Sequence, residues 1–250
     1  MLLRRSGEDA LIIGQASHAW LSGQLARAWG NDRFPAPDPR EEVCLAACQH
    51  DVGWAEWDLQ PALNPADGWP HSFMDMPDLA AHIELWSTAP DRLLSQSVYA
   101  ALLVSMHGTA LYARRDLGQL AEGDADLIRR YLEAERGRQA QLAARLGADR
   151  AQLARNQRLI WTWDSMSLAI CLPWDPHTAT RVPAGEEEVD LEMRGTAPDR
   201  FEVRPWPFST PEIRVHCEAR RLTERYDGER ELRAALAGAP LERLAFTLSQ

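Results

Sequence analysis

The periodicity of apolar residues changes once along the chain, at Pro173, and this change limits the possible folds more than any other feature. Before Pro173, apolar residues recur every three to four positions, as on one face of an α-helix. After a stretch with three prolines and the acidic run Glu186-Glu187-Glu188, the pattern becomes strand-like alternation with β-branched residues. The alternating segments are residues 189–195, 200–208, 212–222 and 241–250. The sequence therefore predicts a helical body followed by a β-rich region.

The first 172 residues contain most of the expected helices. Ser17 is a plausible N-cap and Gly30 a plausible stop for a helix over residues 17–29. Further helices are predicted over residues 41–50, 78–88, 90–113, 124–146 and 149–172, with a short one over 228–239. Residues 53–78 are rich in Pro, Gly, Asp and Trp, and they predict a long ordered loop of the kind that often has a function.

Two short strands are expected before the first helix, over residues 2–5 and 10–14, joined by a tight turn. We expect them to pair with the C-terminal strands. The predicted fold is therefore mainly α, a helical bundle with a small antiparallel β-sheet formed by N-terminal and C-terminal strands. In this division, residues 1–14 join the sheet, residues 15–172 form the helical core, and residues 173–250 form a linker and the β-rich region.

The composition excludes several classes of protein. A chain of 250 residues with 45% hydrophobic and 26% charged residues is typical of a globular protein. The net charge of -10 argues against nucleic-acid binding, and no apolar run is long enough for a membrane span. The N-terminus lacks a secretory signal and the four cysteines do not suggest a disulfide scaffold, so a cytoplasmic location is expected. The oligomeric state stays open, with a homodimer among the options.

The dipeptide His50-Asp51 is the strongest chemical signal in the sequence. It ends an apolar helical run and is soon followed by Gly53, so both side chains can turn toward one point. A neutral imidazole beside a carboxylate suits a metal ion, and the two carboxylate oxygens can bridge two ions. This dipeptide therefore predicts part of a metal site.

Asp164 lies in the middle of an expected helix, and no basic residue stands three or four positions away to pair with it. Because a buried carboxylate is very unfavourable alone, Asp164 needs a metal ion or an ion pair from a distant segment. His107 has apolar helix neighbours, so it is expected to face the core, where it must bind a hydrogen-bond partner or a metal. His18 could be a ligand or could cap its helix, and His82 could be a ligand or a half-exposed surface residue.

The order of these residues along the chain resembles the HD-domain superfamily of metal-dependent enzymes. The matching residues are His18, His50, Asp51, His82, His107 and Asp164. The string HDVGW looks like the HD-hydrophobic-Gly motif of that superfamily, and His82 and His107 would supply the second-metal histidines of its dinuclear branch. Many members have a lysine that contacts an anionic substrate group where this chain has Trp54. The resemblance implies an HD-like helical bundle over residues 15–172.

The resemblance also implies a cofactor and a reaction. One or two divalent ions per chain, Fe, Mn, Zn or Co, would be bound by the six residues. With His50 and Asp51 as the catalytic pair, the simplest activity is metal-dependent hydrolysis of a small phosphoester. A di-iron oxygenase that cleaves a C–C or C–P bond is the alternative, and a non-catalytic ligand-binding HD scaffold is the second alternative.

The expected partner is a small-molecule substrate. Tryptophans near the candidate ligands predict an aromatic-lined pocket, with Trp54, Trp57 and Trp161 in contact with substrate, although core positions would suit them equally. Arg158 is the expected source of positive charge, with Arg114 or Arg115 as alternatives.

Overall fold

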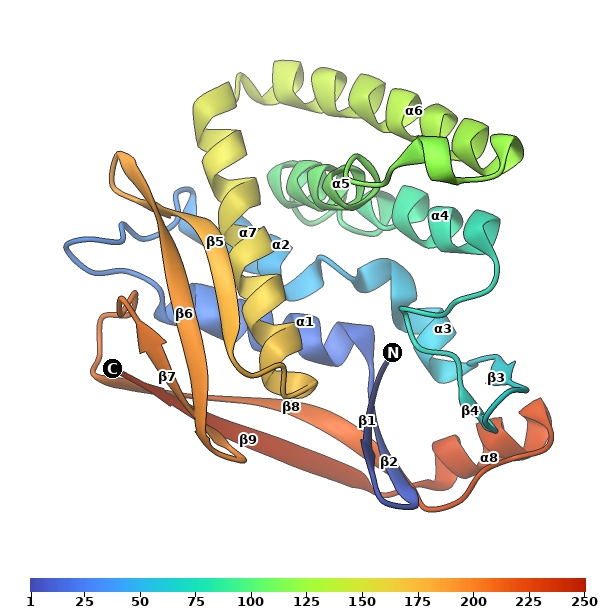
Figure 1. Cartoon of the computed structure of the whole chain (residues 1–250). Coiled ribbons are helices and arrows are strands. Elements are labelled where there is room, and N and C mark those ends of the chain that lie inside the picture. Colours follow the sequence, from blue (N-terminus) through green and yellow to red (C-terminus); the bar gives the residue numbers. More distant parts are fainter.

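The computed structural model describes residues 1–250, apart from the side chain of Ser6. Its helices pack on a curled sheet that partly encloses two of them (Figure 1). The longer helices are α1 (Gln15–Ala28), α2 (Arg40–Gln49), α4 (Leu79–Thr88), α5 (Val98–Tyr112), α6 (Glu122–Leu146), α7 (Arg150–Cys171) and α8 (Glu229–Gly238). The short helical segments are η1 (Val52–Trp54), α3 (Ala55–Leu59), η2 (Pro90–Arg92) and η3 (Leu117–Gln119).

The main sheet has seven strands in the order β1-β2-β8-β9-β7-β6-β5. Their bounds are β1 (Leu2–Ser6), β2 (Asp9–Ile13), β5 (His177–Ala184), β6 (Glu187–Ala197), β7 (Arg200–Arg204), β8 (Glu212–Leu222) and β9 (Leu241–Ser249). Neighbouring strands are antiparallel except β7 and β9, which are parallel. The N-terminal hairpin joins the C-terminal strands through β2 and β8, with Ala10 opposite Leu222.

The predicted fold class, a mainly α bundle with a small antiparallel sheet, was wrong. Helices make up 48% of the chain and strands about a quarter, and the sheet is large, curled and mixed. Part of the difference comes from residues 177–184, which the sequence assigned to a linker and which form β5. Because β5 is an edge strand and pairs on one side only, Pro183 can lie in it without interrupting the ladder.

Helices α1 and α7 connect the sheet to the rest of the molecule. Helix α1 contacts β8, and α7 contacts β5, on the inner side of the curl (Figure 1). Helix α1 also packs on α2 and α7, while α5 packs against α2, α6 and α7. Apolar side chains from these helices and from the strands form one hydrophobic core. The positions of α1, α2, α5 and α7 matter most here, because these four helices meet at the candidate site.

Residues 53–78, predicted as a long loop, contain η1, α3 and a two-stranded sheet of β3 (Leu63–Asn64) and β4 (Trp69–Pro70). Trp69 packs with apolar residues of the N-terminal hairpin and α8. Trp54, at the start of the segment, joins a second cluster with Trp86, Tyr112 and Tyr131. This aromatic cluster lies between η1 and helices α4, α5 and α6.

None of the helices in the described part of the chain combines the length and the apolar character that a bilayer crossing demands.

Candidate metal centre

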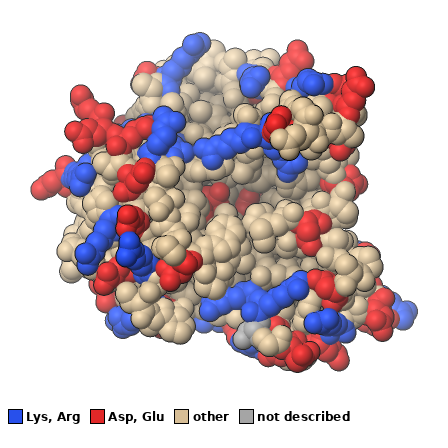
Figure 2. All heavy atoms as spheres, viewed as in Figure 1, with Lys and Arg blue, Asp and Glu red and all other residues tan. Residues whose placement is uncertain are grey.

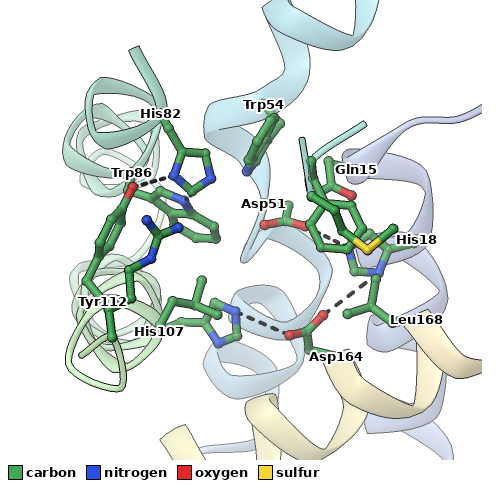
Figure 3. Close-up of a pocket in the computed structure, with 14 residues that line it drawn as sticks. Gln15, His18, Asp51, Trp54, His82, Trp86, His107, Tyr112, Asp164 and Leu168 are labelled. Atoms are coloured by element: carbon green, nitrogen blue, oxygen red, sulfur yellow. Dashed lines mark hydrogen bonds and ion pairs between the residues drawn. The ribbon is translucent and has the colours of Figure 1, made fainter. Parts of the chain in front are cut away.

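Five of the six predicted metal ligands lie together in the interior of the protein. They are His18, His50, Asp51, His107 and Asp164. Their potential ligand atoms form two groups, each within 4.8 Å: His18, His50 and Asp51, and His50, His107 and Asp164. Each of the five side chains is buried. Figure 3 shows His18, Asp51, His107 and Asp164 pointing toward one another, from α1, the turn after α2, α5 and α7.

The end of α2 explains how two adjacent residues can face the same point. On an uninterrupted helix, neighbouring side chains point about 100° apart. Here α2 ends at Gln49, His50 is its C-cap, and Asp51 leaves helical geometry with φ -104° and ψ 19°. The break turns the Asp51 carboxylate back toward the imidazole, so that Oδ2 lies 3.5 Å from His50 Nε2.

Hydrogen bonds fix which nitrogen of His50 faces the cluster. Nδ1 lies 2.9 Å from the carbonyl oxygen of Ala47, which can only accept, so Nδ1 carries a proton. Nε2 then faces the carboxylates, 3.3 Å from Asp164 Oδ1, with no hydrogen-bond partner among the described residues. An imidazole held in this way is the usual arrangement of a metal-binding histidine.

His18 is oriented by the same logic. Its Nδ1 lies 2.8 Å from Ser167 Oγ. The hydroxyl of Ser167 donates to the carbonyl oxygen of Asp164, so Ser167 Oγ accepts from His18. His18 Nε2 therefore faces Asp51 Oδ2, at a distance of 2.6 Å. A proton can bridge this nitrogen and this carboxylate oxygen, and a metal ion that binds both atoms would take its place.

The electrostatics of the cluster favour positive charge. Burial lowers the pKa of His50, but the carboxylates of Asp51 and Asp164 outweigh burial and hold the pKa at about 9. Burial and the charge of His50 lower the pKa of His107 to about 4, so His107 is a neutral imidazole. The proton on His50 Nε2 lies close to both carboxylates. A metal ion bound to the same nitrogen would replace this proton and would be attracted by both negative charges. Mixed imidazole and carboxylate donors suit Fe, Mn, Zn or Co.

His82 lies outside the two ligand groups, on the other side of a cavity from Asp164 (Figure 3). Its Nδ1 contacts the hydroxyl of Tyr112, and its Nε2 lies 3.5 Å from the indole nitrogen of Trp86. Its ring packs edge-on against Trp54, with 5.1 Å between ring centroids. Burial and the nearby charge of Arg115 lower the pKa of His82 to about 4. His82 is therefore a neutral imidazole held by aromatic side chains.

A cavity of about 310 Å³ opens onto the ligand cluster. His18, Asp51, His107 and Asp164 lie on one side of it, and the other walls include Trp54, Trp86, Tyr112 and Arg115. Figure 2 shows a hollow in this face of the molecule, with acidic atoms at its bottom and basic side chains along its upper rim. A small molecule that enters the cavity meets the ligand cluster directly.

The predicted substrate-binding residues lie in different places. Trp54 lines the cavity, whereas Trp57 packs against the aromatic cluster and is not part of the cavity wall. Trp161 packs against His107, with 5.8 Å between ring centroids, but is not part of the cavity wall. Arg158 donates hydrogen bonds to the carbonyl oxygens of Thr180 and Arg181, away from the cavity.

Several residues of the site were not assigned a role from the sequence. Those that line the cavity include Gln15, Trp86, Leu111 and Tyr112, and Ser167 orients His18. Helical spacing could have identified two of these residues. Trp86 follows His82 by four residues and Leu111 follows His107 by four, so each lies on the same helix face as a candidate ligand.

Gly53 allows α4 to approach the site closely. A Cβ at position 53 would lie 2.0 Å from the backbone oxygen of Leu85, which cannot move without shifting α4. We therefore expect Gly53→Ala to lower the free energy of unfolding by about 1–3 kcal/mol, measured by urea denaturation. It should also displace His82 and Trp86 from the cavity wall.

Gly137→Ala is the matched control, because a Cβ there meets nothing within 4 Å on an exposed face of α6. This variant should raise the free energy of unfolding, by up to about 1 kcal/mol, since alanine favours helix over glycine. Equal effects of the two substitutions would contradict the close packing of α4 against Gly53.

One protein family matches most of this chain. The sequence model of the family described as "Protein of unknown function (DUF3891)" matches residues 1–224. No curated protein and no solved structure matches the chain.

The assignment to the HD-domain superfamily was wrong. The family that matches is a different one, and the large curled sheet with its packed helices is not an HD helical bundle. The physical reason is that the order of histidines and aspartates along the chain reflects the chemistry of metal binding. It does not specify how helices and strands are connected in space. Helices of many folds can bring histidines and aspartates to one buried point, so their order along the chain does not define the fold.

Proposed function

The chain belongs to the DUF3891 family, and we propose that it is a metal-dependent hydrolase of a small ester, in the first place a phosphoester. One observation carries this proposal. Five buried nitrogen and oxygen ligands converge beside a cavity large enough for a small molecule. Such a cluster is costly to bury without a cation, and the adjoining cavity gives a substrate access to it.

The geometry favours one ion per chain. His50 belongs to both groups of ligands, but only its Nε2 faces the cluster, because Nδ1 binds Ala47. A single nitrogen lone pair binds one ion, so the two groups cannot each hold a separate ion through His50. An ion bound to His50 Nε2 therefore takes its other ligands from one group, His18 and Asp51 or His107 and Asp164.

The chain's own residues suit hydrolysis. A bound divalent ion would polarise the ester and lower the pKa of a water molecule. Asp51, which borders the cavity, can accept a proton from the attacking water. Ser167 and Ala47 hold the imidazoles of His18 and His50 in fixed orientations. Aromatic side chains on the other walls shield the reacting groups from bulk water.

Hydrolysis is better supported than the di-iron oxygenase alternative. That alternative depends on six ligands for two ions, and His82 would have to be the sixth. Both ring nitrogens of His82 already have neighbours, the Tyr112 hydroxyl and the Trp86 indole. The five remaining residues share one nitrogen of His50, so they supply a three-residue ligand set to one ion and not to two.

The experiment is a panel of small phosphoesters with protein loaded in turn with Mn, Zn, Co or Fe. We expect turnover with at least one metal, and His50→Ala should lower kcat/KM at least roughly hundredfold, because it removes the ligand common to both groups.

His216→Ala is the control, since His216 lies on β8 outside both ligand groups. It should retain the parent kcat/KM. The proposal fails if no phosphoester in the panel is hydrolysed by metal-loaded protein, or if His50→Ala and His216→Ala have the same activity.

A further inference from the structure

Arg115 is the cationic side chain among the residues that line the cavity. Its guanidinium lies over the ring of Tyr112, 4.9 Å from the centroid. It forms no ion pair and no side-chain hydrogen bond with the described residues, so its donors are free. A guanidinium has five N–H donors in a planar fork that matches a carboxylate or a phosphate. A free one at the wall of a cavity can bind an anionic group.

Three other arginines contact groups outside the cavity wall. Arg114 lies over the ring of Trp161, 3.7 Å from its centroid. Arg92 forms an ion pair with Glu56 at 2.9 Å, and Arg158 is bound to backbone carbonyl oxygens of β5. Arg115 is thus distinguished from these three by its position on the cavity wall.

Arg115 reaches the cavity from beyond the end of α5. His107, Leu111 and Arg115 follow one another at intervals of four residues and all line the cavity. Helix α5 ends at Tyr112, so His107 joins the cavity from within the helix and Arg115 joins it from the turn that follows. A ligand in the cavity can therefore contact both residues through different groups.

Flat aromatic side chains form other walls of the cavity. Trp54, Trp86 and Tyr112 present aromatic rings to the cavity (Figure 3). Two buried polar atoms there, Trp54 Nε1 and Gln15 Oε1, have no hydrogen-bond partner among the described residues. Buried polar groups are nearly always paired, so these atoms point to a ligand as their partner.

We propose that Arg115 binds a second acidic group of the substrate, so that the substrate is a small ester with a carboxylate or similar group beyond a flat apolar spacer. The inference rests on the proposed function and names its substrate class. The ester end lies at the five metal ligands, the spacer lies against Trp54 and Trp86, and the acid end pairs with Arg115.

The test compares two isosteric esters, 4-carboxyphenyl phosphate and 4-carbamoylphenyl phosphate, with metal-loaded protein. They differ in the charge of the distal group. The parent protein should prefer the carboxylate ester in kcat/KM by roughly ten- to hundredfold, the range expected for a charged hydrogen bond. Arg115→Gln should reduce this ratio to about one.

Arg114→Gln is the matched control, because it removes the same charge from the adjacent residue, whose guanidinium lies on Trp161. It should keep the carboxylate preference. A ratio that Arg115→Gln leaves unchanged, or that both substitutions reduce equally, would overturn the inference.

A binding measurement separates this inference from the proposed function. The phosphonates 4-carboxybenzylphosphonate and 4-carbamoylbenzylphosphonate cannot be hydrolysed, and calorimetry gives their affinities without turnover. Suppose that the protein hydrolyses no ester but binds the carboxylate compound more tightly than the carbamoyl compound, and that Arg115→Gln removes this preference. The inference would then be supported, although the proposed function would have failed. Equal affinities, or no binding of either compound, would overturn the inference.

Discussion

Asp51→Ala should reduce the metal content of the purified, metal-loaded protein from about one ion per chain to background. Asp51 Oδ2 lies 2.6 Å from His18 Nε2 and 3.5 Å from His50 Nε2, so one carboxylate oxygen faces both imidazoles. Without Asp51, the facing nitrogens of His18 and His50 lack the nearby negative charge that stabilises a bound cation. Elemental analysis after desalting measures the loss.

Metal-dependent stability gives a second readout of the same variant. A metal that binds only the folded state, at one hundred times its Kd, adds about 2.7 kcal/mol to the free energy of unfolding. We expect this gain in the parent protein and in Asp32→Ala, which removes an exposed carboxylate. Asp51→Ala should show no gain. Normal metal content in Asp51→Ala would refute the candidate metal centre.

Trp163→Ala should lower the free energy of unfolding by about 3–5 kcal/mol, the usual cost of truncating a buried tryptophan. Trp163 is fully buried in α7, with its ring 5.7 Å from that of Trp29. The neighbouring residue is Asp164, so the same helix turn supports both the core and the metal ligands. Urea denaturation of the metal-free protein measures the change.

Trp20→Ala is the control for this prediction, because Trp20 is 48% exposed on α1. Its loss should cost about 1 kcal/mol or less, since a surface site leaves no cavity. If the two substitutions destabilise the protein equally, Trp163 is not a central packing residue. A loss below about 1 kcal/mol in Trp163→Ala would have the same meaning.

The residues that converge at the candidate site could be selected from the sequence because burial of charge has a cost in any fold. Asp164 has no basic residue within reach on its own helix, so a cation had to come from elsewhere. The surroundings of His82 could not be predicted, because Tyr112, its hydroxyl partner, is thirty residues further along the chain. Arg158 was a poor choice for a similar reason, since its carbonyl partners belong to β5.

The extent of the sheet depended on contacts between distant segments. Period-two alternation identified the strands after residue 188, but β5 has two prolines near or within it and no clear alternation. The parallel pairing of β7 with β9 and the curl around α1 and α7 have no local signal at all. The histidines and aspartates follow the order of the HD-domain superfamily, but this order suggested the wrong fold. The same ligand residues can be brought together by several folds.

Periodicity and residue chemistry by themselves determined the helices, most strands and the identity of the buried acids and imidazoles. Tertiary structure alone decided the size of the sheet, the separation of His82 from the other ligands and the presence of Arg115 at the cavity. The physical reason is that helix formation and the cost of burying a charge depend on nearby residues or on a single group. Strand pairing depends on segments that are distant in the sequence and meet only in the folded chain. The direction of a long side chain such as that of Arg115 depends in the same way on the residues around it.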